Sequence, residues 1–229
     1  MEFFQNLLKG FGGGVCIALG GTAFLSVADP LVGGVLFSVG LFSILLFGLN
    51  LYTGKVGYIP ERPLSYLFNE VLSSWLGNFL GVVTLAQSLL LTHRGQAITS
   101  RAAEISKAKL SASFLSLFIL AVLCGLMVYF MVESYRRYSK ANLGSAIFYS
   151  ALCVEVFLVS GFEHSIADMY FFTMSGTLIP HLPEVLLISL GNLLGGCLMP
   201  CAKLFYNTLF CQEPAPAADE YRRATLSQL

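Results

Sequence analysis

The chain has 229 residues, of which 56% are hydrophobic and 11% are charged, and its formal net charge is zero. A soluble domain carries about 25% charged residues, so a chain this apolar cannot cover a water-facing surface and must be solvated mainly by lipid. Nucleic acid is excluded as a partner, because neutralising its phosphates requires a basic surplus that this chain lacks.

Apolar runs of about 20 residues, the length that crosses a bilayer, recur along the chain. Six spans are expected, at roughly 8–28, 31–51, 66–92, 110–132, 143–172 and 183–210. The first follows neither a basic segment nor a small-residue cleavage site, so we expect a retained span rather than a signal peptide. The fifth is too long for one straight crossing and contains several polar or small residues, which predicts a broken helix. These residues are Ser160, Gly161, Glu163, His164 and Asp168.

Basic residues are distributed unevenly around these spans. With the N-terminus inside, the inner segments hold nine Lys and Arg residues and the outer segments hold four. This bias predicts a multi-pass protein of the cell membrane with both termini in the cytoplasm. All four outer charges lie in the connection 93–109, which either draws an anion towards an entrance or is an ordinary solvated loop. We expect one membrane domain over 1–211 and a disordered cytoplasmic tail over 212–229.

A six-residue motif repeats 114 positions apart. LGNFLG at 76–81 lies in the third run, and LGNLLG at 190–195 lies in the sixth. Small residues allow close contact between helices in a membrane, and a buried Asn can donate hydrogen bonds across that contact. We therefore expect a packing role for Asn78 and Asn192.

Polar, glycine-bearing interruptions precede both motifs, one near Thr53 and one at 160–165. The two halves, about 8–92 and 110–210, each contain three spans. Because three is odd, the halves enter the membrane in opposite directions. Such an inverted repeat, with a broken second and fifth helix, typically marks a permeation site near the membrane midplane. Irregular backbone survives at that depth only where protein buries it or where it lines an aqueous cavity, so the sequence predicts a pore or transporter.

His164 is the principal candidate for chemistry at this site. Ionisable groups within a membrane are costly, and histidine exchanges a proton near neutral pH. By protonating a weak-acid anion it would remove a Born cost on the order of 20 kcal/mol. A histidine that only hydrogen-bonds between helices is the alternative. Thr53 supplies a hydroxyl on the opposing interruption, Lys109 is placed to attract an anion, and Glu163 is interpreted as structural.

No metal or cofactor is expected. A metal site requires several converging ligands. Two of the three histidines lie in predicted connections, and no histidine forms a metal-ligand spacing. The six cysteines lie in or beside apolar runs without a CxxC motif, which is typical of packing residues.

At these residues the chain resembles the formate/nitrite transporter family, over about residues 10–210. The segment SGFEHSIADM at 160–169 resembles the family signature SGFEHSIANM. LYTG at 51–54 resembles the family's LFTG loop, and both Gly-Asn motifs fit. The resemblance implies an aquaporin-like fold, a homopentamer with one pore per protomer, and transport rather than enzymatic activity. The implied substrates are formate, nitrite or hydrosulfide, and Phe162 favours formate.

The resemblance also implies a role for each site residue. His164 would donate the proton, Thr53 would be its hydroxyl partner, and Lys109 (or Lys107) would be the vestibule lysine. Leu41 and Phe157 would form the cytoplasmic constriction and Leu51 the outer one. Gly54 and Gly161 belong to the matched motifs.

Three positions depart from the family pattern. Asn50 replaces an acidic residue, Gly125 replaces an Asn that formate channels often carry, and Asp168 replaces the Asn of the signature. The leading interpretation is a channel or proton-coupled carrier for weak-acid anions. A neutral-solute channel and a non-transporting oligomeric scaffold are the alternatives.

Overall fold

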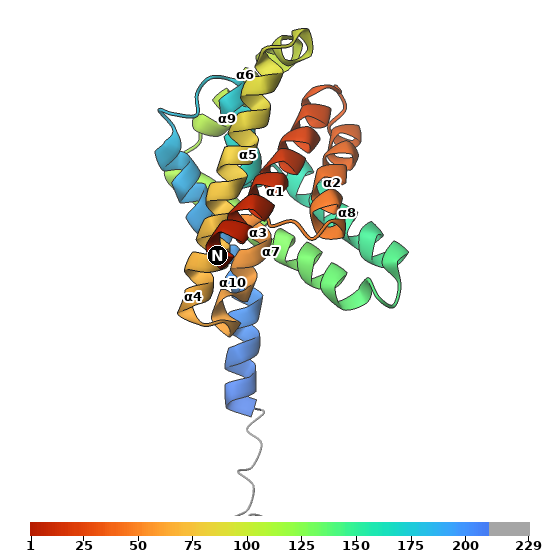
Figure 1. Cartoon of the computed structure of the whole chain (residues 1–229), viewed down its shortest axis with the longest axis vertical. Coiled ribbons are helices and arrows are strands. Elements are labelled where there is room, and N and C mark those ends of the chain that lie inside the picture. The colour runs from red at the N-terminus through yellow and green to blue at the C-terminus, as the bar shows by residue number, and fades with distance from the viewer. Residues whose placement is uncertain (211–229) are drawn as a thin grey trace, which may run out of the picture.

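The computed structural model describes residues 1–210, which form helices and their connections (Figure 1). The predicted tail at 212–229 lies outside this part. The first half contains α1 (Glu2–Leu25), α2 (Pro30–Leu46), α3 (Tyr52–Lys55), the 3₁₀ helix η1 (Val56–Glu61), α4 (Leu64–Tyr66), the π-helix η2 (Leu67–Leu72) and α5 (Ser73–Leu90). After it come α6 (His93–Leu110), α7 (Phe114–Tyr138), α8 (Leu143–Val159), α9 (Ser165–Met174) and α10 (Leu182–Phe210).

Three of the described helices, α1, α7 and α10, are each long and apolar enough to cross a bilayer alone. The run 64–90 and helix α6 meet this test as a pair, bent by 116°. Helices α2 and α8 are apolar but only 17 residues long. After a break of five residues each, the chain resumes as α3 or α9. The predicted all-α membrane fold with broken second and fifth helices is confirmed.

Each half is organised around a close pair of helices, α1 with α5 and α7 with α10. Glycines permit this contact. A Cβ on Gly81 would overlap the carbonyl oxygen of Phe11, and a Cβ on Gly195 would overlap that of Val122. The small residues of the two repeated motifs therefore bring α5 and α10 against equivalent positions of α1 and α7. In Figure 1, α2 and α8 lie together on one side of these pairs.

The polar stretch 93–109 forms a helix, so the expectation of an ordinary solvated loop is wrong. Thr92 caps the helix by accepting a hydrogen bond from the Gly95 amide at 3.1 Å. Ile98, Ala102 and Ser106, spaced four residues apart, form its buried face. This spacing is typical of an amphipathic helix and was present in the sequence, but the polar composition concealed it.

Arg101, one of the outer basic residues, has a structural role in this helix. Its guanidinium donates to the carbonyls of Val27 and Ala28, just after α1 ends. The same group lies 5.6 Å from the centre of the Phe24 ring, a cation–π distance. Arg101 therefore ties α6 to the end of α1.

Candidate functional site

The two breaks have the same backbone construction. Gly48 and Gly161 adopt left-handed φ angles of 62° and 66°, a conformation that suits glycine because it lacks a Cβ. At the first break the Leu49 amide donates to the Ile44 carbonyl at 2.9 Å, and at the second the Phe162 amide donates to the Phe157 carbonyl at 2.9 Å. Each residue of the first break is therefore 113 positions before its equivalent in the second, as Gly48 is before Gly161.

The first break is held by the buried side chain of Asn78 from α5. Its Oδ1 accepts a hydrogen bond from the Tyr52 amide at 2.8 Å. Its Nδ2 donates to the carbonyls of Asn50 at 2.9 Å and Gly10 at 2.7 Å. One amide therefore satisfies backbone groups on both sides of a single residue, Leu51, and anchors them to α1.

The second break is held in the same way by Asn192 from α10. Its Oδ1 accepts from the Ser165 amide at 2.9 Å, and its Nδ2 donates to the carbonyls of Glu163 and Ala121 at 2.8 Å each. The residue enclosed between these contacts is His164. Leu51 and His164 are thus the repeat counterparts, each preceding the short helix that resumes after its break.

The two breaks meet through a buried polar contact. Thr53 Oγ1 lies 3.0 Å from His164 Nε2, and these residues are 0% and 1% exposed. On the other side of the imidazole, Nδ1 accepts a hydrogen bond from the Ala167 amide at 3.1 Å and caps α9. The Phe157 ring stacks on the imidazole with ring centres 5.7 Å apart, and Phe37 packs edge-on against Phe157 at 6.3 Å.

Lys109, at the end of α6, lies in an ion cluster with two carboxylates. Its Nζ is 2.5 Å from Glu163 Oε2 and 3.0 Å from Asp168 Oδ1. The three side chains are 16%, 4% and 1% exposed. Glu163 and Asp168 flank His164 in the chain, so the bend between α5 and α6 returns a positive charge to the second break. Sequence reasoning identified Lys109 but not these partners, because a separation of 54 or more residues carries no local signal.

An open pocket of about 790 Å³ reaches the first break. Its wall includes Leu41 and Leu51 together, whereas the sequence expectation placed them at opposite ends of the path. Phe157 is not among the residues that line it. The polar residues of the wall come mainly from segments predicted to be cytoplasmic. They include Glu2, Lys9, Lys55, Arg62, Glu70 and Arg136.

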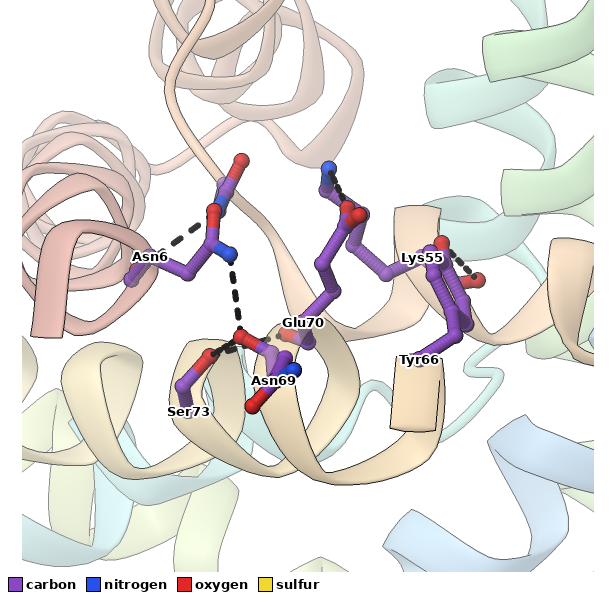
Figure 2. Close-up of polar contacts among 7 residues, drawn as sticks. Asn6, Lys55, Tyr66, Asn69, Glu70 and Ser73 are labelled. Carbon is purple, nitrogen blue, oxygen red and sulfur yellow. Dashed lines mark hydrogen bonds and ion pairs between the residues drawn. The ribbon is translucent and has the colours of Figure 1, made fainter. Parts of the chain in front are cut away.

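Side-chain amides connect the first break to the wall of this pocket by hydrogen bonds. Asn50 Nδ2 donates to Asn6 Oδ1 at 2.9 Å, and Asn6 Nδ2 donates to the Asn69 carbonyl at 2.9 Å. Figure 2 shows Asn6 reaching towards η2 while Lys55 pairs with Glu70 at 2.7 Å. Asn50, a departure from the family pattern, therefore has a defined partner, and η2 is a π-helix, a form often found at functional sites.

Several contacts at the site could not be predicted from the sequence alone. Trp75 Nε1 donates to Ser189 Oγ at 3.0 Å, and these residues are 114 positions apart, so repeat counterparts touch one another. Tyr52 donates a hydrogen bond from its phenolic hydroxyl to the Ser189 carbonyl at 2.9 Å.

The two glycines of the matched motifs differ in their roles. Gly161 adopts a left-handed φ angle, whereas Gly54 faces Val132 with limited space for a Cβ.

Comparison with known proteins identifies relatives of this chain in sequence and in structure. A family described as formate/nitrite transporter matches residues 1–206. The nitrite transporter NirC of Salmonella typhimurium is 29% identical over 209 residues, which cover 82% of this chain and 75% of that protein. The formate channel FocA of Haemophilus influenzae is 26% identical over 190 residues, covering 75% and 66%. A solved pentameric formate channel with formate bound matches at a TM-score of 0.72 and 23% identity, over 92% of this chain and 98% of that one.

Proposed function

Because this chain belongs to the formate/nitrite transporter family, we propose that it is a membrane channel for small monovalent weak-acid anions. Formate is the leading substrate, followed by nitrite and hydrosulfide. The relatives that are named as formate channels and nitrite transporters support the first two. Hydrosulfide is included because it too is a small monovalent anion of a weak acid.

The contact between Thr53 Oγ1 and His164 Nε2 at 3.0 Å carries this proposal. It joins the two breaks of an inverted repeat, where permeation sites are typically found. Both residues are buried, so a solute beside them exchanges its water shell for one hydroxyl and one imidazole. Polar groups that are few and fixed favour a small solute that can accept hydrogen bonds.

The hydrogen bonds of His164 define how it handles a proton. Since Nδ1 accepts from the Ala167 amide, neutral His164 holds its proton on Nε2 and directs it to Thr53. The Thr53 hydroxyl then has its own hydrogen to offer to an anion. To protonate the anion, His164 must first gain a second proton at Nδ1, which requires Nδ1 to release the Ala167 amide.

This requirement couples protonation of His164 to binding of the anion. A buried imidazolium is costly unless an opposite charge lies beside it, so we expect the second proton to be held only while an anion occupies the site. Transfer of the Nε2 proton to an oxygen of formate or nitrite leaves a neutral imidazole and a neutral acid. The neutral acid can pass apolar side chains at far lower cost than the ion.

The apolar constrictions are revised from the sequence expectation. We propose that Leu41 and Leu51, which share the pocket wall, form the cytoplasmic constriction. Phe157, which stacks on His164, and Phe37, which packs edge-on against Phe157, form the other. Phe37 precedes Leu41 by four residues on α2, which starts from a connection predicted to be outside, so this order along the path follows the helix direction.

Assembly and orientation complete the proposal. The similar solved channel is a pentamer, and we propose a homopentamer with one pore per protomer. The excess of basic residues on the N-terminal side supports cytoplasmic termini.

The test is uptake of formate and nitrite into proteoliposomes from pH 5.5 to 8, with His164→Asn as the variant. We expect wild-type uptake to rise as the pH falls. In His164→Asn we expect uptake at low pH to drop on the order of 100-fold, the scale of a lost general acid, and the pH dependence to flatten. Unchanged flux and pH dependence in the variant would contradict the proton role. Absence of anion flux from a folded oligomer would favour a scaffold, and osmotic swelling without anion would favour a neutral-solute channel.

A further inference from the structure

The ion cluster at the second break contains more negative than positive charge. Lys109 Nζ is the common partner of Glu163 and Asp168, at 2.5 and 3.0 Å. With both carboxyl groups ionised, the cluster would carry one net negative charge. Such a charge beside His164 would repel the anions that the channel is proposed to pass.

The second oxygen of Asp168 indicates how this surplus is relieved. Asp168 is 1% exposed, and its Oδ2 is buried without a hydrogen-bond partner within residues 1–210. A buried ionised oxygen without a donor bears a large desolvation cost, whereas a protonated carboxyl bears much less. Two carboxyl groups that share one site do not both ionise readily.

Lys109 is the cationic group of this cluster among the described residues. Helices α1, α5, α6 and α10 pack against α9, and of these α6 brings the charge of Lys109. The titratable group that α7 adds near this cluster is the buried thiol of Cys124. His164 lies one turn before Asp168, whose amide donates to the His164 carbonyl at 2.9 Å. Proton exchange at this carboxyl pair therefore changes the charge close to the permeation site.

We propose that Asp168 is a specificity-determining residue that makes anion admission depend on a proton shared between its carboxyl group and that of Glu163. With the proton present, the cluster is neutral and an anion can approach Lys109 and His164. When the proton is lost, the cluster is negative and repels the anion. This inference rests on the proposed function, and it assigns to Asp168 an effect separate from proton transfer by His164.

Asp168→Asn tests this inference, because it preserves the size of the side chain and leaves Lys109 with one carboxylate. Formate uptake by reconstituted full-length protein would be measured over a range of concentrations at pH 6 and pH 8. Comparing variants at the same pH removes the effect of formate's own titration. At pH 8 we expect the apparent KM of Asp168→Asn to be about tenfold lower than that of wild type, because a nearby negative charge is gone. At pH 6 the two should be nearly equal.

Glu155→Gln is the matched control. Glu155 lies on α8, and its carboxyl oxygens are beside Gly34 of α2 without a hydrogen-bond partner within residues 1–210. This variant should keep the wild-type ratio of KM values at the two pH values. An equal KM for Asp168→Asn and wild type at pH 8, or a change of the same size in Glu155→Gln, would overturn the inference.

A second measurement keeps the inference testable without transport. Infrared difference spectra of the purified protein between pH 6 and pH 8 should show the carbonyl stretch of a protonated carboxyl group. That signal should be weaker than in wild type in both Asp168→Asn and Glu163→Gln, because either change removes one member of the pair, and the Glu155→Gln spectrum identifies any contribution from the buried Glu155 carboxyl. A signal as strong as that of wild type in both variants would overturn the shared proton. If wild type passes no anion but the infrared signal behaves as expected, the proposed function fails while the shared proton stands.

Discussion

The two breaks differ at the residue that each asparagine encloses, although their frames are nearly identical. The first frame, around Asn78, presents Leu51, whose side chain forms no hydrogen bond to the helix that follows. The second, around Asn192, presents His164, which caps α9 and contacts Thr53. Their surroundings also differ: an amide chain joins the first break to α1 and η2, whereas an ion cluster borders the second.

This difference separates the role of the repeat from the role of the site. The duplicated glycines, asparagines and left-handed turns hold two interrupted helices in frames of the same construction. The chemistry then depends on single substitutions within that frame, a leucine in one half and a histidine in the other. At this position one half therefore carries an apolar side chain and the other an ionisable one.

The largest expected effect tests whether the two frames are equally important for folding. A Cβ on Gly14 would overlap the Asn78 carbonyl oxygen, and a Cβ on Gly125 would overlap that of Asn192. We expect Gly14→Ala and Gly125→Ala each to lower the free energy of unfolding by about 3 kcal/mol, the upper range for overpacking. Thermal unfolding in detergent would measure this. Gly144→Ala is the control, because its Cβ would meet only the Asn142 side chain at 3.6 Å. A large loss of stability in only one of Gly14→Ala and Gly125→Ala would show that the two frames are not equally important for folding.

A smaller effect tests the difference between the halves. Asn78→Asp and Asn192→Asp each keep the oxygen that accepts a backbone hydrogen bond. Each loses the NH₂ group that donates two hydrogen bonds to backbone carbonyls. We expect both to be destabilised by about 2 kcal/mol, the scale of unsatisfied buried groups. Only Asn192→Asp should also alter the pH profile of formate uptake, since it frames His164. An equal shift of the profile in Asn78→Asp would show that the frame around His164 has no special role.

The sequence is sufficient to predict an all-helical membrane fold with two broken helices. Hydropathy and the length of 143–172 indicated the membrane fold and the broken fifth helix, because lipid solvation imposes a strong constraint on composition. The Gly-Asn motifs predict a packing role for Asn78 and Asn192, but they do not predict that α5 packs on α1 and α10 on α7. The 114-residue offset was less reliable at the breaks, where counterparts are 113 residues apart, so it did not reveal that Leu51 corresponds to His164.

Other features depended on tertiary contacts that sequence separation conceals. Helix α6 was missed because its polar surface outweighed the spacing of its few buried residues. The partners of Lys109 could not be predicted because a bend of 116° between α5 and α6 places it. The position of Leu51 on the wall of the pocket at the first break was also hidden, since it depends on how the chain turns at Gly48.

A double-mutant cycle on Thr53 and His164 tests most directly whether the two breaks act as one site. Formate uptake would be compared among wild type, Thr53→Val, His164→Asn and the double variant, all at low pH. Because the two side chains are in hydrogen-bond contact, we expect a coupling free energy of at least about 1 kcal/mol. Thr53→Val should reduce uptake in the wild-type background and have almost no further effect once His164 is replaced. The same fold reduction in both backgrounds would contradict a shared site.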